Sequence, residues 1–189
     1  MKKITFFIGA VLFISAFGGL HAQDEAAMKA WQAYMTPGDV HKMIAESDGS
    51  WNEEVTTWMT PDAAPTKSTA TVENKMILGG RYQQSTHTGN FNGMPFEGFS
   101  ILGYDNAKKV FLSSWIDNMG TGIMQMQGTW DPATKTIQFN GVSVDPITGK
   151  DVPVRQTFTL VDNNNQKMEM YMTQDGKEMK TMEISLTRK

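Results

Sequence analysis

The chain has 189 residues, and its 17 lysines and arginines against 20 aspartates and glutamates give a formal net charge of −3 at pH 7. Because the basic residues are scattered singly, the sequence lacks the basic stripe that neutralises phosphates, and we expect no nucleic-acid partner. The chain contains no cysteine, which excludes disulfides, thiol redox chemistry and thiolate metal sites.

The first 22 residues have the pattern of a secretory signal peptide. Lys2 and Lys3 form a short basic start, residues 4–17 are almost wholly apolar, and Ala22 is a small residue suited to cleavage. The apolar run is shorter than the ~20 residues that span a bilayer. We therefore predict an exported protein, periplasmic or secreted, with no membrane span after cleavage. An uncleaved N-terminal anchor is the alternative.

The mature chain that would follow has the size of one domain. Residues 24–34 predict a weak helix, and residues 36–39 (Thr-Pro-Gly-Asp) predict the start of a short helical segment that Gly49 ends. We assign residues 23–36 to an N-terminal extension and residues 37–189 to the folded domain.

From Trp51 onward, apolar and polar residues alternate in runs separated by turn-forming residues. A period of two is typical of strands with one buried face, and turns such as Gly79-Gly80 and Asp175-Gly176 join consecutive runs directly. The pattern predicts ten strands, at residues 51–60, 67–78, 80–90, 96–104, 109–117, 121–130, 135–142, 152–162, 166–173 and 178–188. An open sheet of this size would expose two edges, so we predict an all-β fold, a closed antiparallel up-and-down β-barrel.

Several motifs, in this order, resemble the bacterial domain-of-unknown-function 1579 family over about residues 37–189. The motifs are Gly49-Ser50-Trp51, Leu78-Gly79-Gly80-Arg81-Tyr82, Gly93-Met94-Pro95-Phe96-Glu97-Gly98, Gly103-Tyr104-Asp105, Trp115-Ile116-Asp117, Gly128-Thr129-Trp130-Asp131, and the ending from Asp175-Gly176-Lys177-Glu178 through Met182-Glu183-Ile184 to Arg188. The resemblance implies a lipocalin-like β-barrel. It brings no established activity, substrate or catalytic residues.

A looser resemblance to the wider lipocalin-like group concerns Trp51 and Arg188. In that group a Gly-x-Trp motif opens the first strand, and an arginine of the last strand covers the tryptophan. The resemblance implies a cation–π contact between Arg188 and Trp51, worth about 0.5–2 kcal/mol. We expect this pair to be structural and to close one end of the barrel.

Methionine is the strongest compositional anomaly, at 15 residues. Met124 and Met126 share one face of their predicted strand, and Met168, Met170 and Met172 share one face of another. Thioethers pack adaptably against varied apolar partners, and they also suit Cu(I). Because no histidine or cysteine accompanies them in sequence, we favour an apolar cavity lined by methionines and aromatic residues. Copper binding is an alternative, and we assign no metal site and no cofactor.

Histidine is scarce, and His87 is the only one on a predicted strand, where it shares a face with Arg81, Gln83 and Ser85. It is therefore the one strand candidate for an axial ligand in a haem-binding barrel of the nitrobindin type, which is a second alternative. The competing interpretation is a solvated strand position.

Polar specificity inside or at the mouth of the barrel is expected from a small set of residues. The candidates are Arg81, Tyr104, Asp105, Trp115, Asp117 and Glu183. Small-molecule sites are typically apolar cavities with a few placed polar groups, and the guanidinium of Arg81 suits a carboxylate. In the competing interpretation the two aspartates cap turns and Arg81 pairs with Glu183.

The sequence thus predicts an exported barrel that binds a small apolar or amphipathic molecule. The ligand-binding candidates are Arg81, Tyr104, Trp115, Asp117, Met124, Met126, Met170 and Glu183, and no residue is assigned as catalytic. Two other classes stay open. One is an enzyme that uses Arg81, Asp117 and Glu183 together in the barrel mouth, and the other is a ligand-free structural or interaction module with a filled interior.

Overall fold

The computed structural model describes residues 18–60, 63–91, 93–174 and 176–189. The chain divides into two compact units between Met35 and Thr36. In the first unit the described residues form helix α1 (Gly18–Met35), which includes the helix predicted at residues 24–34. Most of the predicted signal peptide lies outside the described residues. Neither described helix has the length and apolar character needed to cross a membrane.

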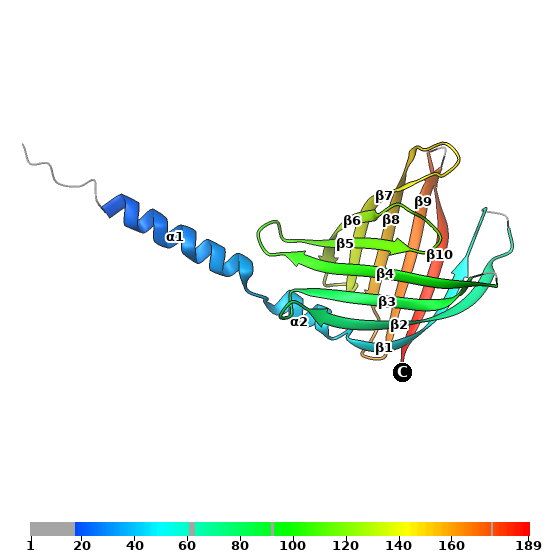
Figure 1. Ribbon diagram of the computed structural model, residues 1–189, viewed down its shortest axis with the longest axis horizontal. Coiled ribbons are helices and arrows are strands. Elements are labelled where there is room, and N and C mark those ends of the chain that lie inside the picture. The colour runs from blue at the N-terminus through cyan, green and yellow to red at the C-terminus, as the bar shows by residue number, and fades with distance from the viewer. Residues whose placement is uncertain (1–17, 61–62, 92, 175) are drawn as a thin grey trace, which may run out of the picture. The chain divides into compact units, whose positions relative to one another are not determined.

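The second unit is a β-barrel (Figure 1). Helix α2 (Asp39–Ala45) precedes the described strands, which are β1 (Gly49–Thr57), β2 (Thr66–Ile77), β3 (Tyr82–Phe91), β4 (Met94–Asp105), β5 (Val110–Asp117), β6 (Met124–Asp131), β7 (Thr136–Val144), β8 (Asp151–Leu160), β9 (Asn165–Gln174) and β10 (Lys177–Arg188). Each strand pairs antiparallel with the next in the chain, and β10 pairs with β1. The predicted closed up-and-down barrel of ten strands is confirmed.

Tight turns explain why consecutive strands are neighbours. Gly79 and Gly80 adopt φ values of +68° and +79° between β2 and β3, a region that glycine enters without steric cost. In other turns an aspartate takes over backbone hydrogen bonds: Asp131 Oδ1 accepts from the Ala133 amide at 2.9 Å. These connections leave no room for crossovers, so the sheet grows strand by strand until it closes.

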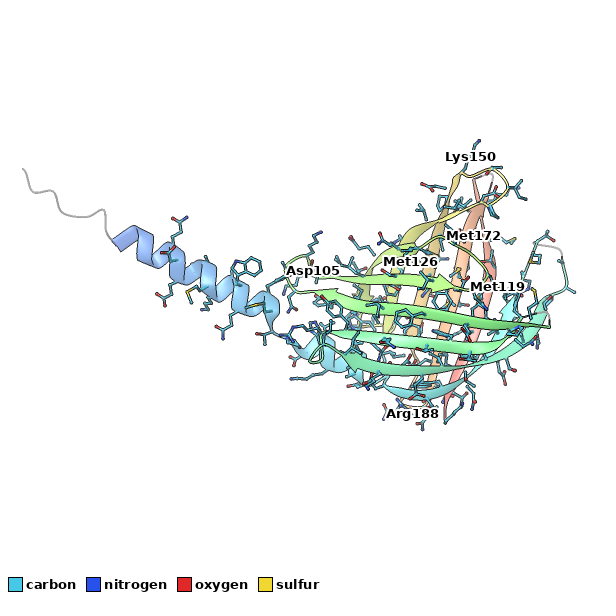
Figure 2. The ribbon with its side chains drawn as sticks, in the orientation of Figure 1. Asp105, Met119, Met126, Lys150, Met172 and Arg188 are labelled. Carbon is cyan, nitrogen blue, oxygen red and sulfur yellow. The ribbon has the colours of Figure 1, made fainter. Side chains whose placement is uncertain are left out.

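Alternation along each strand separates an inner from an outer face, as expected for a half-buried strand. On β6, Met126 and Gly128 are buried while Gln125 and Gln127 are exposed, which confirms the predicted faces of this strand. Figure 2 draws the side chains along the strands and labels Met126 on β6 and Met172 on β9.

The core is concentrated at the barrel end that α2 covers, which we call the packed end. Ile44 of α2 belongs to a buried cluster whose other members are Phe111, Met126, Ile137, Phe139 and Val154. Trp51, Val72 and Leu186 form a second cluster beside it. Trp51, Phe111 and Val154 are each less than 2% exposed. Burial of large apolar side chains is the main favourable term in folding, so stability is concentrated here.

Hydrogen bonds tie the end of α2 to several strands. The Ser47 carbonyl accepts from Trp51 Nε1 and from Asn74 Nδ2, each at 3.0 Å. Gln83 Nε2 donates to the Ile44 carbonyl at 2.9 Å, and Gln166 Nε2 donates to Ser47 Oγ at 2.8 Å. The last carbonyls of a helix need such partners, so the buried polar residues at this end serve the closure of the barrel.

Arg188 completes the packed end in the way that the lipocalin-like resemblance implies. Its guanidinium lies 4.2 Å from the centroid of the Trp51 ring. Nη1 donates to the Asp48 carbonyl at 2.7 Å and Nη2 to the Glu46 carbonyl at 2.6 Å. The expected Trp51–Arg188 contact is therefore confirmed, and the same side chain also holds the segment that follows α2.

Candidate functional site

Beyond the packed end the barrel is hollow. The cavity has a volume of about 1080 Å³ and is lined by side chains from all ten strands. Small-molecule sites usually measure about 300–1,000 Å³, so this space is large enough for a ligand of that kind. The sequence left open whether the interior is hollow or filled, and the structure shows a hollow one.

The lining is mainly apolar and rich in methionine. The methionines among the described lining residues are Met43, Met119, Met124, Met126, Met168, Met170 and Met182. The predicted residues Met124, Met126 and Met170 thus face the cavity. Met172, which was expected to share a face with Met168 and Met170, packs against the same buried cluster as Met124 and Met170 but is not among the described lining residues. Unbranched thioethers adapt to the shape of an apolar guest, which suits a cavity wall.

Two titratable side chains meet inside this wall. Glu53 of β1 is 3% exposed, and its Oε1 and Oε2 lie 3.1 and 3.2 Å from Nδ1 of His87 on β3. Ala70 stands opposite Glu53 on the intervening strand β2. Its methyl group is small, so the glutamate can reach diagonally across β2 to the imidazole.

The imidazole in turn contacts an indole on the next part of the wall. The rings of His87 and Trp115 meet edge to face, with centroids 5.0 Å apart. Trp115 Nε1 donates to Asp117 Oδ2 at 2.7 Å. Gly98 lies beside the Trp115 ring, and a Cβ at that position would collide with the indole. Glycine at this position therefore allows the ring to lie flat along β4. We refer to Glu53, His87, Trp115 and Asp117 as the His87 site.

The two ring nitrogens of His87 differ in their surroundings. A carboxylate held against Nδ1 fixes the orientation of the ring, as it does for many functional histidines. Nε2 has no hydrogen-bond partner among the described residues, and His87 lines the cavity. The site therefore offers one oriented nitrogen to whatever occupies the hollow.

Charge on the cavity wall is acidic. Glu53, Asp117 and Asp151 line the cavity, and neither lysine nor arginine occurs among its described lining residues. His87 is the one basic group among them. Asp117 also ends β5, because its Oδ1 accepts from the amides of Met119 and Gly120 at 2.9 and 3.1 Å.

The other predicted site residues lie elsewhere. Tyr104 faces the packed end, where its ring contacts Phe111 at a centroid distance of 5.0 Å and His41 at 6.0 Å. Arg81 lies in the β2–β3 turn, where Nη1 donates to the Leu78 carbonyl at 3.0 Å. Neither Tyr104 nor Arg81 belongs to the described cavity lining.

Asp105 caps a turn, as the competing interpretation expected. Its Oδ1 accepts from the amides of Ala107 and Lys108 at 2.8 and 2.9 Å. The hydrogen bond from Lys108 is the main reason why the pKa of Asp105 lies below its usual value. Because this carboxylate is already engaged by its own turn, we give it no part in ligand binding.

Glu183 lies on the outer face of the barrel in an ion-pair cluster. The cluster consists of Glu183, Glu169, Lys167 and Lys180, and Lys180 Nζ lies 2.5 Å from Glu169 Oε1 and 2.8 Å from Glu183 Oε2. The hydrogen bond from Lys180 lowers the pKa of Glu169 to about 2. Of the three residues in the enzyme hypothesis, Asp117 alone lines the cavity. The structure therefore does not assemble Arg81, Asp117 and Glu183 into one site.

His41 serves the helix rather than the cavity. It is 5% exposed, and its Nδ1 accepts from the Gly38 amide at 3.0 Å. Burial lowers its pKa because a charged imidazole is disfavoured away from water. Within the described residues, no three His, Asp or Glu side chains are grouped so as to hold a metal ion.

Glu53 is the functional candidate that the sequence interpretation missed. Strand alternation carries the signal, because Glu53 stands two residues after Trp51 and therefore shares the inner face with it. What alternation does not give is its partner, since the contact with His87 crosses an intervening strand.

Comparison with known proteins supports the fold and adds the family. The crystal structure of Rv2717c from M. tuberculosis superposes with a TM-score of 0.61 and 14% sequence identity, over 82% of this chain and 99% of that one. At this identity the similarity concerns the fold alone. No curated protein matches the sequence. The model of the family described as "Protein of unknown function (DUF1579)" matches residues 36–188. The chain belongs to the DUF1579 family.

Proposed function

We propose that the protein is an exported carrier or receptor that binds a small apolar or amphipathic molecule inside the barrel. The observation that carries the proposal is the cavity of about 1080 Å³, apolar over most of its wall and polar at the His87 site. Protein interiors are normally packed to the density of organic crystals, so a hollow of this size is unusual unless a guest fills it.

The alternative of a ligand-free structural module is less well supported. In such a module the inward side chains pack against one another and stabilise the fold. Here the apolar side chains of Val55, Phe96 and Ile184 face the cavity instead. Apolar side chains on an unfilled wall forfeit dispersion contacts. A bound apolar molecule restores those contacts, which gives binding its driving force.

Two adjacent serines on β5 give a matched test. Ser113 lines the cavity, whereas Ser114 does not. N-phenyl-1-naphthylamine, a neutral apolar dye, should bind the purified protein saturably. Ser113→Phe should weaken that binding roughly tenfold or more by filling the cavity, and Ser114→Phe should leave it unchanged. Absence of saturable binding, or equal effects of the two variants, would contradict the proposal.

Export is tested separately. Protein isolated from its own host should have the mass of a chain that begins at Gln23, and it should be recovered outside the cytoplasm. Native mass spectrometry of the same sample should show an additional bound mass. A mass that still includes residues 1–22 would contradict cleavage without touching the binding proposal.

One observation favours haem as a second candidate. His87 Nδ1 contacts a carboxylate while Nε2 has no partner among the described residues, an arrangement that metal-ligating histidines commonly share. Titration with haem should then shift the Soret band of the haem, and His87→Phe should abolish this shift. The shift should be retained in Thr88→Phe, because Thr88 is an exposed neighbour of His87 on β3. An unshifted band in the wild type would exclude this candidate.

A further inference from the structure

The described lining of the cavity carries acidic side chains and contains no lysine or arginine. Its described charged residues are Glu53, Asp117 and Asp151, and His87 is the only basic one. Three cations of strands β8, β9 and β10 are engaged elsewhere. Lys167 and Lys180 bind glutamates of the outer ion-pair cluster, and Arg155 pairs with Glu178.

Glu53 is the most constrained of these acids. It is 3% exposed, and the described contacts give its carboxylate one partner, His87 Nδ1. A carboxylate has about four lone-pair sites, and a single N–H leaves most of them unused. In low dielectric an unneutralised carboxylate is costly. The carboxylate therefore favours a guest that brings hydrogen-bond donors.

A second buried acceptor lies on the same wall. Asn74 is 7% exposed and lines the cavity; its Nδ2 donates to the Ser47 carbonyl, while Oδ1 has no partner among the described residues. Buried polar atoms without partners are rare in native proteins. Glu53 and Asn74 thus both present acceptor oxygens with unused capacity on this wall.

We propose that the cavity selects amphiphiles with a cationic, hydrogen-bond-donating head group, a hydrophobic amine being the matching chemistry. This inference rests on the proposed binding function and names the class of its ligand. An ammonium group would lie against the His87 site, where it neutralises Glu53 and donates to its free lone pairs. A ligand carboxylate would add a further negative charge to an acidic wall of low dielectric, where like charges repel strongly. Fatty acids are therefore poor ligands.

A series with one chain length and three head groups tests the proposal on the wild-type protein. Decylamine, decanol and decanoate share the same apolar tail, and at neutral pH they are cationic, neutral and anionic. Isothermal titration should give the tightest binding for decylamine, with decanoate roughly tenfold weaker or more, the value expected for loss of one charge-assisted hydrogen bond. Equal affinity for decylamine and decanol, or tighter binding of decanoate, would overturn the inference while leaving the binding function intact. Failure of all three to bind would overturn both.

Two glutamates on β1 provide matched variants. Glu53 faces the cavity and the next residue, Glu54, is exposed. Glu53→Gln preserves the shape and removes the charge, so the preference for decylamine over decanoate should fall by roughly tenfold. Glu54→Gln removes the same charge from the outer surface and should preserve the preference. If Glu53→Gln does not fold, Asp151→Asn at the exposed end of β8 should reduce the preference in the same direction. An unchanged preference in the folded variant would overturn the role of the acidic wall.

Discussion

The packed end and the hollow half of this barrel are made from the same ten strands, yet they treat their inward side chains differently. At the packed end Trp51 and Phe111 are fully buried, and α2 fills the opening. In the hollow half, inward residues such as Met168, Met170 and Met182 face a cavity and are only partly buried. The difference teaches that one well-filled end is sufficient to close the ring. The other half of the same strands can then surround an unfilled interior, which is available for a ligand.

The largest loss of stability is expected from a substitution of Trp51 at the packed end. Trp51→Ala removes a fully buried indole, its hydrogen bond to the Ser47 carbonyl and the stacking of Arg188. Loss of a buried tryptophan typically lowers the free energy of unfolding by about 3–5 kcal/mol. Urea unfolding measures the change. The affinity for the dye in the folded fraction should stay close to that of the wild type. A variant with an unchanged melting temperature would show that the packed end does not carry the stability.

One methionine from each half allows the packing of the two halves to be compared directly. Met126 is 5% exposed and belongs to the buried cluster where that cluster borders the cavity, whereas Met182 is partly buried and faces the cavity outside the buried clusters. Met126→Ala should cost about 2–5 kcal/mol, the usual range for a packed site. Met182→Ala should cost less than about 1 kcal/mol, because Met182 lies outside the buried clusters and its removal only enlarges the existing hollow. Equal losses in urea unfolding would mean that the two halves are packed alike.

Arg188 tests the polar part of the packed end. Arg188→Lys keeps the charge but loses the planar fork that donates to the Asp48 and Glu46 carbonyls. We expect a loss of about 1–3 kcal/mol in the free energy of unfolding, the range for hydrogen bonds to charged groups. Arg155→Lys is the control, since its pair with Glu178 is partly exposed on the outer surface and should contribute less than about 1 kcal/mol.

The smallest effect concerns the outer ion-pair cluster, which belongs to neither half of the comparison. The pKa of Glu169 falls from the usual 4.5 to about 2 on folding. A lowered carboxylate pKa stabilises the folded state fully above pH 4.5, and this contribution is lost as the pH falls from 4.5 towards 2. Glu169→Gln should remove part of the acid sensitivity in that window and cost less than about 1 kcal/mol at pH 7. Identical stability curves across that pH range would contradict this assignment.

Sequence periodicity predicted the strands and their faces well because a barrel repeats one local rule. Alternation together with turn chemistry determines which residues face inward, and Met124, Met126 and Met170 line the cavity on the face that alternation groups them on. Alternation contains no information on contacts across an intervening strand. The Glu53–His87 pair depends on strand register and on the small side chain of Ala70, and neither can be read from one strand.

The positions of Glu183 and Arg81 show two other limits. Arg188 covers Trp51 from the inner face, and Glu183 lies five residues before it on β10, so alternation places Glu183 on the outer face. The predicted Trp51–Arg188 contact was therefore incompatible with the assignment of Glu183 to the ligand site. A bulge between Lys180 and Met182 then brings Lys180 to the same outer face as Glu183. Arg81 follows Gly79 and Gly80 in the turn, where strand alternation does not apply.

The seam between β1 and β10 has a consequence for the order of assembly. Trp51 stands opposite Arg188 there, and Arg188 binds the Asp48 carbonyl across 140 positions of sequence. Such distant contacts form late, because the intervening chain must lose its freedom first. Arg188 therefore secures the closure of the ring, and a chain that lacks the end of β10 would have walls but no enclosed chamber.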